Sequence, residues 1–397
     1  MTSAVIVDVV RTASGKGKPG GALSGVHPAD LLATVIRALV ERNGLDPALV
    51  DDVIAGCVGQ YGDQSLNIAR TALLAAGFPE SVPATTVDRQ CGSSQQAAHF
   101  AAQGVMAGAY DIVIACGVES MSRVPMGTSA LDKDPQGPGM HARYPEGLAH
   151  QGIGAELIAA RWKLTREELD EFSATSHQRA AAAHEAGAFA NEIIPIEVTA
   201  PDGTTVTHTV DETVRPTTTV EALANLKPSF YTEAWAKRFP EINWCITPGN
   251  SSPLTDGASA VLIMSERKAN ELGLRPRARF HTFALAGDDP LLMLTAPVPA
   301  TRKVLARAGL TLDDIDVYEV NEAFAPVPLF WARELGADPA KLNPRGGAIA
   351  LGHALGGSGT RLMTTMLNYL EATGGRYGLQ TMCEGAGMAN ATIIERV

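Results

Sequence analysis

The chain has 397 residues, of which 45% are hydrophobic, 19% charged and 5% aromatic, and its formal net charge is −11. This length suits two or three domains, and the low aromatic content favours helices packed on sheets over an aromatic-rich β-sandwich. The acidic balance argues against a nucleic-acid partner, although a few local cations and helix N-termini would suffice to bind an anionic ligand.

The first 120 residues alternate between apolar strand patterns and amphipathic helix patterns. Strands are predicted at residues 4–10, 53–57, 84–88 and 111–116, the last two as buried strands. Helices are predicted at residues 28–42 and 67–76, and from just after Cys91 to about residue 107. This alternation predicts an α/β unit with a largely parallel sheet.

The pattern changes between residues 121 and 250, where Pro and Gly become frequent. A long helix is predicted at residues 166–186, followed by short β-like pieces at 197–199 and 204–210. This stretch looks like an inserted excursion rather than a continuation of the sheet.

The α/β rhythm returns after residue 276. Strands are predicted at residues 279–286, 316–320, 379–383 and 391–395, and helices at 300–308 and 352–371. We therefore expect two duplicated α/β halves. Residues 1–120 with 251–275 form the first, residues 276–397 form the second, and residues 121–250 form an inserted domain.

The five cysteines are odd in number and widely spaced, without a CxxC pair, which argues against a disulfide framework or a zinc site. No signal peptide is evident, and no apolar run approaches the ~18 residues of a membrane span. We expect a cytoplasmic protein with no membrane partner, no metal and no tightly bound cofactor. Cys57, Cys116 and Cys245 are interpreted as packing residues.

Cys91 lies between a predicted strand and a predicted helix, and small residues follow it. Amides at a helix N-terminus stabilise a thiolate, so the sequence predicts an exposed nucleophile of lowered pKa at this position. The alternative is a small buried core cysteine.

Three further motifs carry residues of catalytic type. Many glycines surround His353 in the stretch 346–359, and a histidine there could deprotonate a thiol or polarise a carbonyl. Cys383 ends a strand and enters a glycine turn that contains Gly385. Asn321 lies between a strand and a helix, where it could hold a water or orient an imidazole, or simply cap the helix.

Taken in order, these motifs resemble those of the thiolase family: the nucleophile cysteine, N-E-A-F at 321–324, G-G-A-I-A-L-G-H at 346–353 and C-x-G-x-G at 383–387. The resemblance covers essentially the whole chain. It includes R-T at 11–12, E-S-M-S-R at 119–123, S-H-Q-R-A at 176–180, and G-N-S-S at 249–252 leading to D-G-A at 256–258. It implies the thiolase fold, a layered α-β-α-β-α core with an inserted loop domain.

The resemblance also implies a role for each catalytic residue. Cys91 would be acylated, His353 would activate it, and Cys383 would be the acid/base for the second substrate. One oxyanion hole would use His353 with a water held by Asn321, and the other the backbone N–H groups of Cys91 and Gly385. The implied reaction is CoA-dependent cleavage of a 3-ketoacyl-CoA, or the reverse Claisen condensation, by a homodimeric or homotetrameric acyltransferase.

Coenzyme A is expected as a substrate that lies across the inserted region. By resemblance it contacts Arg215, Phe230, Ser252 and Phe324, and His150 lies near the acyl thioester. Gln151 stands where many short-chain thiolases carry Met. The stretches D-R-Q-C-G-S-S-Q-Q-A at 88–97 and G-G-R-Y-G-L-Q-T-M-C-E-G at 374–385 resemble thiolases of steroid-ring breakdown, which predicts an acyl chain larger than acetoacetyl.

Three other functions fit the sequence less well. A ketoacyl synthase shares the duplicated fold, but it pairs its cysteine with two histidines or with a histidine and an asparagine, whereas Cys383 occupies the terminal position here. A non-catalytic acyl-CoA-binding protein should lack part of the Cys91, His353 and Cys383 set. Gly15, Gly17 and Gly20 spell GxGxxG, but prolines bracket a loop rather than a helix there, which disfavours a dinucleotide site.

Overall fold

The structure, a computed structural model, describes residues 3–200 and 203–397. Its main feature is a mixed sheet in which strands run in the order β11-β12-β13-β10-β1-β9-β5-β3-β4. The strands of the first half are β1 (Ala4–Thr12), β3 (Asp52–Gly56), β4 (Ala84–Val87), β5 (Ile112–Ser120) and β9 (Thr255–Ser265). Those of the second half are β10 (Ala278–Gly287), β11 (Val317–Val320), β12 (Tyr377–Glu384) and β13 (Met388–Arg396).

The two halves repeat one topology. In the first, β3 pairs parallel with β4 and β5, and β9 then pairs antiparallel with β5 and β1. In the second, β11 pairs parallel with β12 and with a single bridge at Leu342, and β13 pairs antiparallel with β12 and β10. The expected duplication is thus confirmed strand by strand.

The prediction of a largely parallel sheet is wrong. The long ladders β5–β9, β1–β9, β10–β13 and β12–β13 are antiparallel, because β9 returns from the excursion and a tight turn joins β12 to β13. The half-sheets are not separate, since β1 also pairs with β10 at Val5↔Arg279 and Ile6↔Ala278. The 84–88 strand is not buried either, because β4 is a partly exposed edge strand.

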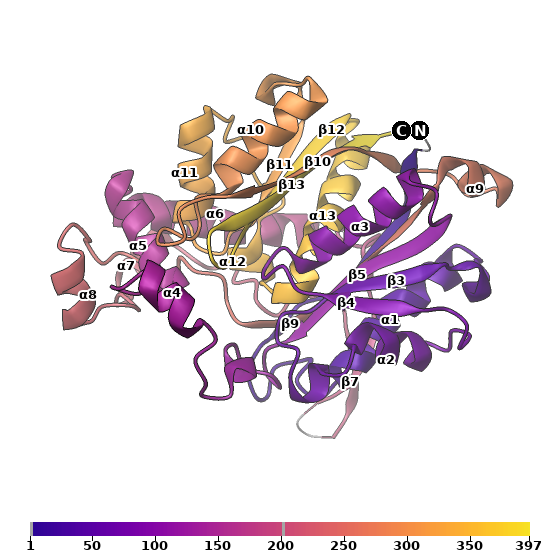
Figure 1. The fold of residues 1–397 in the computed structure, drawn as a ribbon, viewed down its shortest axis with the longest axis horizontal. Coiled ribbons are helices and arrows are strands. Elements are labelled where there is room, and N and C mark those ends of the chain that lie inside the picture. The colour runs from indigo at the N-terminus through magenta and orange to yellow at the C-terminus, as the bar shows by residue number, and fades with distance from the viewer. Residues whose placement is uncertain (1–2, 201–202) are drawn as a thin grey trace.

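Helices form three layers around the half-sheets. The outer layers contain α1 (Pro28–Arg42) and α2 (Ile68–Ala75) on one side, and α10 (Pro297–Ala308) and α11 (Pro326–Leu335) on the other. Between the half-sheets lie α3 (Ser93–Met106) and α13 (Ser358–Thr373), which pack against each other (Figure 1). Both central helices are rich in small and apolar buried residues, so two backbones fit between two sheets.

Between β5 and β9 the chain makes the expected excursion. It contains α4 (Gly137–Arg143), α5 (Gln151–Arg161), α6 (Arg166–Glu185), β6 (Ile193–Ile194), β7 (Ile196–Thr199), β8 (Thr205–His208), α7 (Val220–Ala224) and α8 (Glu233–Arg238). The long helix α6 begins with a full capping box, in which Thr165 and Glu168 bond each other's backbone N–H groups. The division into three domains stays a prediction.

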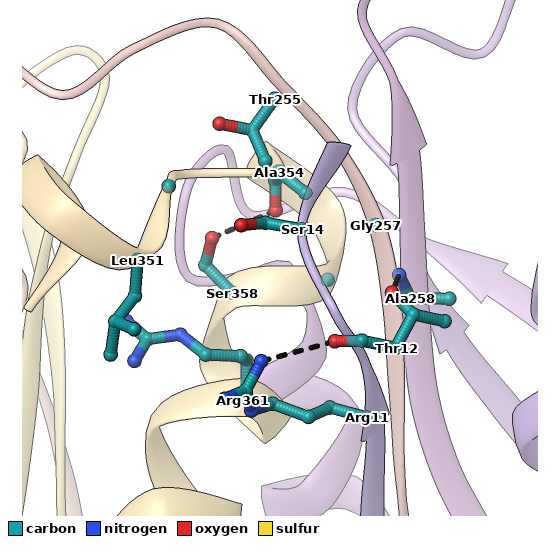
Figure 2. A pocket seen from close by; sticks show the side chains of 12 residues that line it. Arg11, Thr12, Ser14, Thr255, Gly257, Ala258, Leu351, Ala354, Ser358 and Arg361 are labelled. Carbon is teal, nitrogen blue, oxygen red and sulfur yellow. Dashed lines mark hydrogen bonds between the residues drawn. The ribbon is translucent and has the colours of Figure 1, made fainter. Parts of the chain in front are cut away.

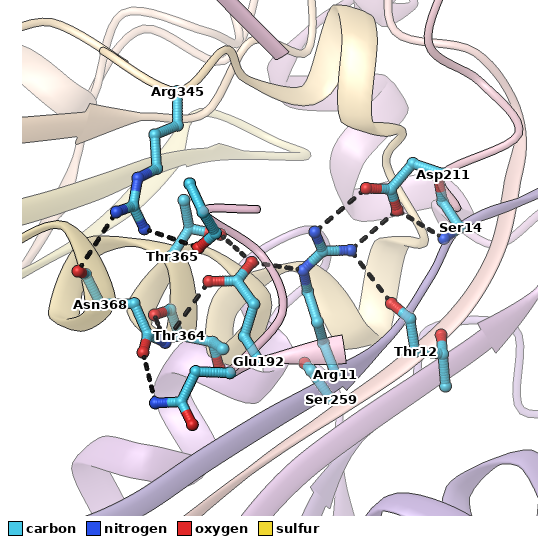
Figure 3. A network of polar contacts seen from close by, with 12 residues as sticks. Arg11, Thr12, Ser14, Glu192, Asp211, Ser259, Arg345, Thr364, Thr365 and Asn368 are labelled. Carbon is cyan, nitrogen blue, oxygen red and sulfur yellow. Dashed lines mark hydrogen bonds and ion pairs between the residues drawn. The ribbon is translucent and has the colours of Figure 1, made fainter. Parts of the chain in front are cut away.

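A buried ion-pair network fastens this excursion to the first strand. The Arg11 guanidinium, at the end of β1, donates to Glu192 through Nε and to both carboxylate oxygens of Asp211 (Figure 3). All three side chains are almost fully buried. Arg11 holds the pKa of Asp211 well below its usual range, against the opposing effect of burial.

Three smaller features complete the fold. Gly15, in β2 (Gly15–Lys16), pairs with β9, and the next helix opens only at Pro28, so the GxGxxG pattern has no dinucleotide-binding geometry. All five cysteines are free thiols and buried, which fits the packing role expected of Cys57, Cys116 and Cys245, whereas Cys91 was expected to be exposed. No helix in the described part of the chain combines the length and apolarity needed to cross a bilayer.

Candidate active site

Cys91 occupies the turn that joins β4 to α3. Gln90 adopts a left-handed backbone conformation, with φ 48°, and Ser93 Oγ donates to the Gln90 carbonyl and accepts from Arg89 N–H. This hydrogen-bonded turn holds Cys91 just before the first turn of α3. The position between strand and helix is the one predicted.

The predicted electrostatics of Cys91 are wrong for the free protein. The residue is only 9% exposed, and burial raises the pKa of its thiol to about 12, with a further increase from the neighbouring Glu384 carboxylate. Helix N-terminal amides alone would have lowered it, but desolvation outweighs them here. Cys91 is therefore a thiol at neutral pH and must lose its proton to a base during reaction.

Cys383 lies near the end of β12, close enough to Cys91 that a thiolate on Cys91 raises the pKa of the Cys383 thiol. Burial is the main cause that raises the pKa of the Cys383 thiol well above its usual value, so this thiol keeps its proton. Gly385 follows in the turn, where a Cβ would stand 2.9 Å from Oε1 of Gln90, the residue that precedes Cys91. The fold thus brings both predicted cysteines and Gly385 to one place.

The contacts of His353 determine its tautomer. Ser358 Oγ lies 2.6 Å from His353 Nδ1 and donates its single proton to the Ala354 carbonyl at 2.8 Å. This arrangement favours the tautomer in which Nδ1–H donates to the hydroxyl and Nε2 carries no proton. Burial lowers the pKa of the imidazole to about 3, so His353 is neutral and its Nε2 is a free base.

Asn321 lies on the other side of this imidazole. Its Nδ2 is 3.4 Å from His353 Nε2, and its backbone N–H donates to the Thr381 carbonyl of β12. The side chain does not cap a helix, because α11 begins only at Pro326. Asn321 Oδ1 is buried and has no partner among the described residues, so it has an unused acceptor facing the site.

The loop that carries His353 is held from three directions. His353 N–H donates to Thr255 Oγ1, and Gly356 N–H donates to the buried Glu119 carboxylate. Gly356 touches the backbone of the first half so closely that a Cβ would stand 2.6 Å from Cys57 Cα. Behind this loop, a cavity of about 20 Å³ between Ser14, Thr255 and Ser358 has room for one water molecule (Figure 2).

The prediction of a helix over residues 352–371 is wrong at its start. A short helix, α12 (Ala348–Leu351), ends at Gly352, whose φ of 85° breaks the helical path. A single 3-10 turn, Leu355–Gly357, follows before α13 begins at Ser358. His353 therefore lies in a loop at the centre of the molecule rather than on a helix.

The predicted CoA contacts fall into two groups. Phe230 packs against His150 and Phe324, with ring centroids 5.4 and 6.1 Å apart. Phe324 and Ser252 line a pocket of about 50 Å³ that has His353 at its wall. Arg215 is exposed, and no contact found within residues 3–200 and 203–397 joins it to these aromatic rings.

Comparison with known proteins identifies the family. Residues 4–267 match the N-terminal domain of thiolase, and residues 274–396 match its C-terminal domain. The chain belongs to the thiolase family. It is therefore an acyltransferase, and the resemblance found in the sequence is confirmed.

Relatives support this thiolase assignment over the full length. A steroid 3-ketoacyl-CoA thiolase of Mycobacterium tuberculosis is 51% identical, over 100% of this chain and 95% of that protein. A 3-ketoacyl-CoA thiolase of Photobacterium profundum is 46% identical, over 100% of both. The crystal structure of the Bacillus anthracis acetyl-CoA acetyltransferase superimposes with a TM-score of 0.89 at 36% identity, over 100% of this thiolase and 99% of that chain.

Several residues that shape the site were not assigned a role from the sequence. Ser358 sets the His353 tautomer, and Glu119 anchors Gly356. Glu322 accepts hydrogen bonds from Ser176 Oγ, Asn343 Nδ2 and Ile349 N–H, which ties the 321–324 motif to the 346–353 motif. Their only signal in the sequence is that each lies within or beside a motif.

Proposed function

We propose that this thiolase cleaves a 3-ketoacyl-CoA with CoA through an acyl thioester on Cys91. His353 Nε2 accepts the Cys91 proton while the sulfur attacks the 3-keto carbon. The bond between C2 and C3 then breaks, and the Cys383 thiol protonates the departing acetyl-CoA enolate. The Cys383 thiolate then takes the proton of the CoA thiol as that sulfur attacks acyl-Cys91, and His353 returns its proton to the departing Cys91 sulfur. The shortened acyl-CoA is released, and the condensation direction reverses these steps.

The observation that carries this proposal is the matched protonation of three buried groups. The His353 imidazole is neutral, with Ser358 at Nδ1 and Nε2 available as a base, Cys91 is a thiol that needs a base, and Cys383 is a thiol able to donate a proton. No prosthetic group is required for any step, and CoA enters only as substrate. A non-catalytic acyl-CoA-binding protein, the alternative, would not need a base and two thiols in these protonation states.

Oxyanion stabilisation is proposed for two places. Asn321 would hold a water through its unpartnered Oδ1, and that water would donate to the thioester oxygen. His353 Nε2–H would donate to the same oxygen once Nε2 has accepted the Cys91 proton. The backbone N–H groups of Cys91 and Gly385 would bind the oxygen of the acylated carbon. Their closeness follows from the packing of Gly385 on Gln90.

The CoA tail is proposed to cross the excursion at 121–250. The chain of aromatic rings from Trp235 through His150 and Phe230 to Phe324 leads to the pocket beside His353. Arg215 is proposed to bind the nucleotide phosphates from the exposed surface. The acyl group is proposed to be larger than acetoacetyl. Two observations favour this: the 51% identity to a steroid 3-ketoacyl-CoA thiolase, and the apolar pocket wall formed by Met121, Met126 and Leu254.

A cytoplasmic homo-oligomer is proposed as the working form. Five unpaired buried cysteines suit a reducing compartment. The edge strand β4 is partly exposed, and the apolar side chains of Leu66 and Phe100 are exposed at 92% and 42%. An exposed edge of this kind can pair with a second copy of the chain, and light scattering after size exclusion measures the assembly.

The test is CoA-dependent cleavage of 3-ketoacyl-CoA substrates of increasing acyl size. We expect turnover by the parent protein and by Cys116→Ala, a buried packing cysteine, and no turnover by Cys91→Ala or Cys383→Ala. Turnover that survives Cys91→Ala would overturn the proposed nucleophile. A preference for acetoacetyl-CoA over all bulkier substrates would overturn the proposed acyl class.

A further inference from the structure

Glu384 is a buried carboxyl group beside the proposed nucleophile that the mechanism above does not use. It follows Cys383 in β12, its exposed fraction is 0%, and neither carboxyl oxygen has a hydrogen-bond partner among the described residues. An ionised carboxylate in such a place would be an unpaired buried charge, which is strongly unfavourable. A structural carboxylate in this fold looks different: Glu119 accepts from three backbone N–H groups.

Glu384 touches the turn that holds Cys91. A Cβ on Gly92 would stand 2.1 Å from Glu384 Oε1 and 2.6 Å from Asn390 Nδ2, so both side chains pack on the Gly92 backbone. Asn390 Nδ2 donates to the Gly92 carbonyl, while Asn390 Oδ1 has no donor among the described residues. The carboxyl group therefore lies against the residue next to the nucleophile, in a polar setting that is incompletely paired.

We propose, on the basis of the function proposed above, that Glu384 is a positioning residue that controls the charge beside the nucleophile. Its neutral carboxyl group permits a thiolate at Cys91, and its ionised form opposes that thiolate. Glu384 thereby limits how readily Cys91 is deprotonated as the surroundings become alkaline.

The charges around Glu384 agree with this role. Burial raises the pKa of the carboxyl group to about 8, Arg89 acts to lower it, and Asp88 acts to raise it further. The carboxyl group is thus mostly neutral at pH 7 and ionised by pH 9. In its ionised form it raises the pKa of the Cys91 thiol, and it acts in the same direction on Cys383.

The test is the pH dependence of Cys91 alkylation by iodoacetamide in the free protein, quantified by mass spectrometry of the Cys91 peptide. We expect Glu384→Gln to match the parent up to about pH 7 and to react faster above pH 8. The gap at pH 9.5 should reach about tenfold, the effect of one pKa unit. Glu384→Met, a neutral apolar replacement of similar length, should give the same profile, which covers the case in which Glu384→Gln folds poorly.

Asp52→Asn is the matched control. It also turns a partly buried carboxyl group of raised pKa into an amide, but at the start of β3, where its partner is the Tyr110 hydroxyl. It should leave the alkylation profile unchanged. Parallel profiles for the parent and both Glu384 variants would overturn this inference alone, whereas a Cys91 no more reactive than Cys116 at any pH would overturn the proposed nucleophile.

Discussion

Ser358, the first residue of α13, places its Oγ 2.6 Å from His353 Nδ1 and donates its hydroxyl proton to the Ala354 carbonyl. The backbone geometry of a helix start thus fixes which nitrogen of the proposed base is free. The buried imidazole cannot rotate without breaking this hydrogen bond and its contact with Asn321. A single hydroxyl therefore decides the chemistry available at Nε2.

Ser358→Ala should lower kcat/KM about tenfold, because loss of a hydrogen bond worth about 1.4 kcal/mol lets the imidazole adopt the unproductive tautomer. Ser358→Thr, which keeps the hydroxyl, should retain most of the activity if it folds. Steady-state kinetics of thiolysis measures both. Equal loss in the two variants would show that packing, not the hydroxyl, matters at this position.

Three buried histidines should each make the fold less stable in acid, an effect opposed by buried carboxyl groups of raised pKa such as Glu384 and Glu319. Burial lowers the pKa of His99, His177 and His353 to about 3, 4 and 3. The unfolded chain binds protons at these residues below pH 6.5 and the folded chain does not, so the contribution of the three histidines to stability falls as pH drops from 6.5 to 5. Each contributes roughly 2 kcal/mol by pH 5.

Urea unfolding at pH 7 and pH 5 measures this loss. His99→Gln, which keeps a neutral partner for the Thr392 hydroxyl, removes one histidine's share, so its change in unfolding free energy between pH 7 and pH 5 should differ from that of the parent by about 2 kcal/mol. An unchanged dependence in that variant would contradict the assignment. The carboxylate Asp211, whose pKa is lowered, contributes stability that is lost only at still lower pH.

Gly356→Ala should destabilise the fold by about 2–3 kcal/mol and reduce activity, because its Cβ would meet the backbone of Cys57, Gly56 and Val118 at 2.6–2.7 Å. Gly139→Ala is the control, since a Cβ there meets nothing within 4 Å and the residue lies in α4. It should be neutral or slightly stabilising. Thermal and urea unfolding compare the two.

Arg11→Met should cost about 3–5 kcal/mol, because it leaves Glu192 and Asp211 as buried carboxylates without their cation. Arg267→Met removes an exposed arginine that pairs with Asp111 and Glu271, and it should change stability little. Denaturant unfolding of both variants measures the difference. A similar effect in the two would mean that the buried network does not fasten the excursion to β1.

The sequence predicted the strands and helices whose apolar period is clean, such as β1, α1 and α6, because local patterning decides them. It missed β9, which opens with the polar and small residues Thr255–Ser259 and is held by strands from distant parts of the chain. It also extended the last helix back to residue 352, since the left-handed turn at Gly352 leaves no apolar signal.

The candidate site divides in the same way. Cys91, His353, Cys383 and Asn321 could be proposed from the sequence because their types are chemically distinctive and their motifs, in this order, resemble those of the thiolase family. The predicted direction of the Cys91 pKa shift was wrong. The burial of Cys91 and its closeness to Glu384 depend on how distant parts of the chain pack, which the local sequence does not show. Ser358 and Glu384 gained roles only when the fold placed a hydroxyl against an imidazole and a carboxyl group against Gly92.

The most direct test of the central claim is mass analysis of the Cys91 peptide after incubation with an acyl-CoA alone. Acyl transfer to Cys91 breaks no carbon–carbon bond, so the parent and Cys383→Ala should both carry one acyl group on Cys91. Cys91→Ser should carry no acyl group that a thiol removes as readily as it removes the group from the parent. CoA should remove the group from both. An acyl group on another residue, or none on Cys91 with any acyl-CoA, would contradict the account.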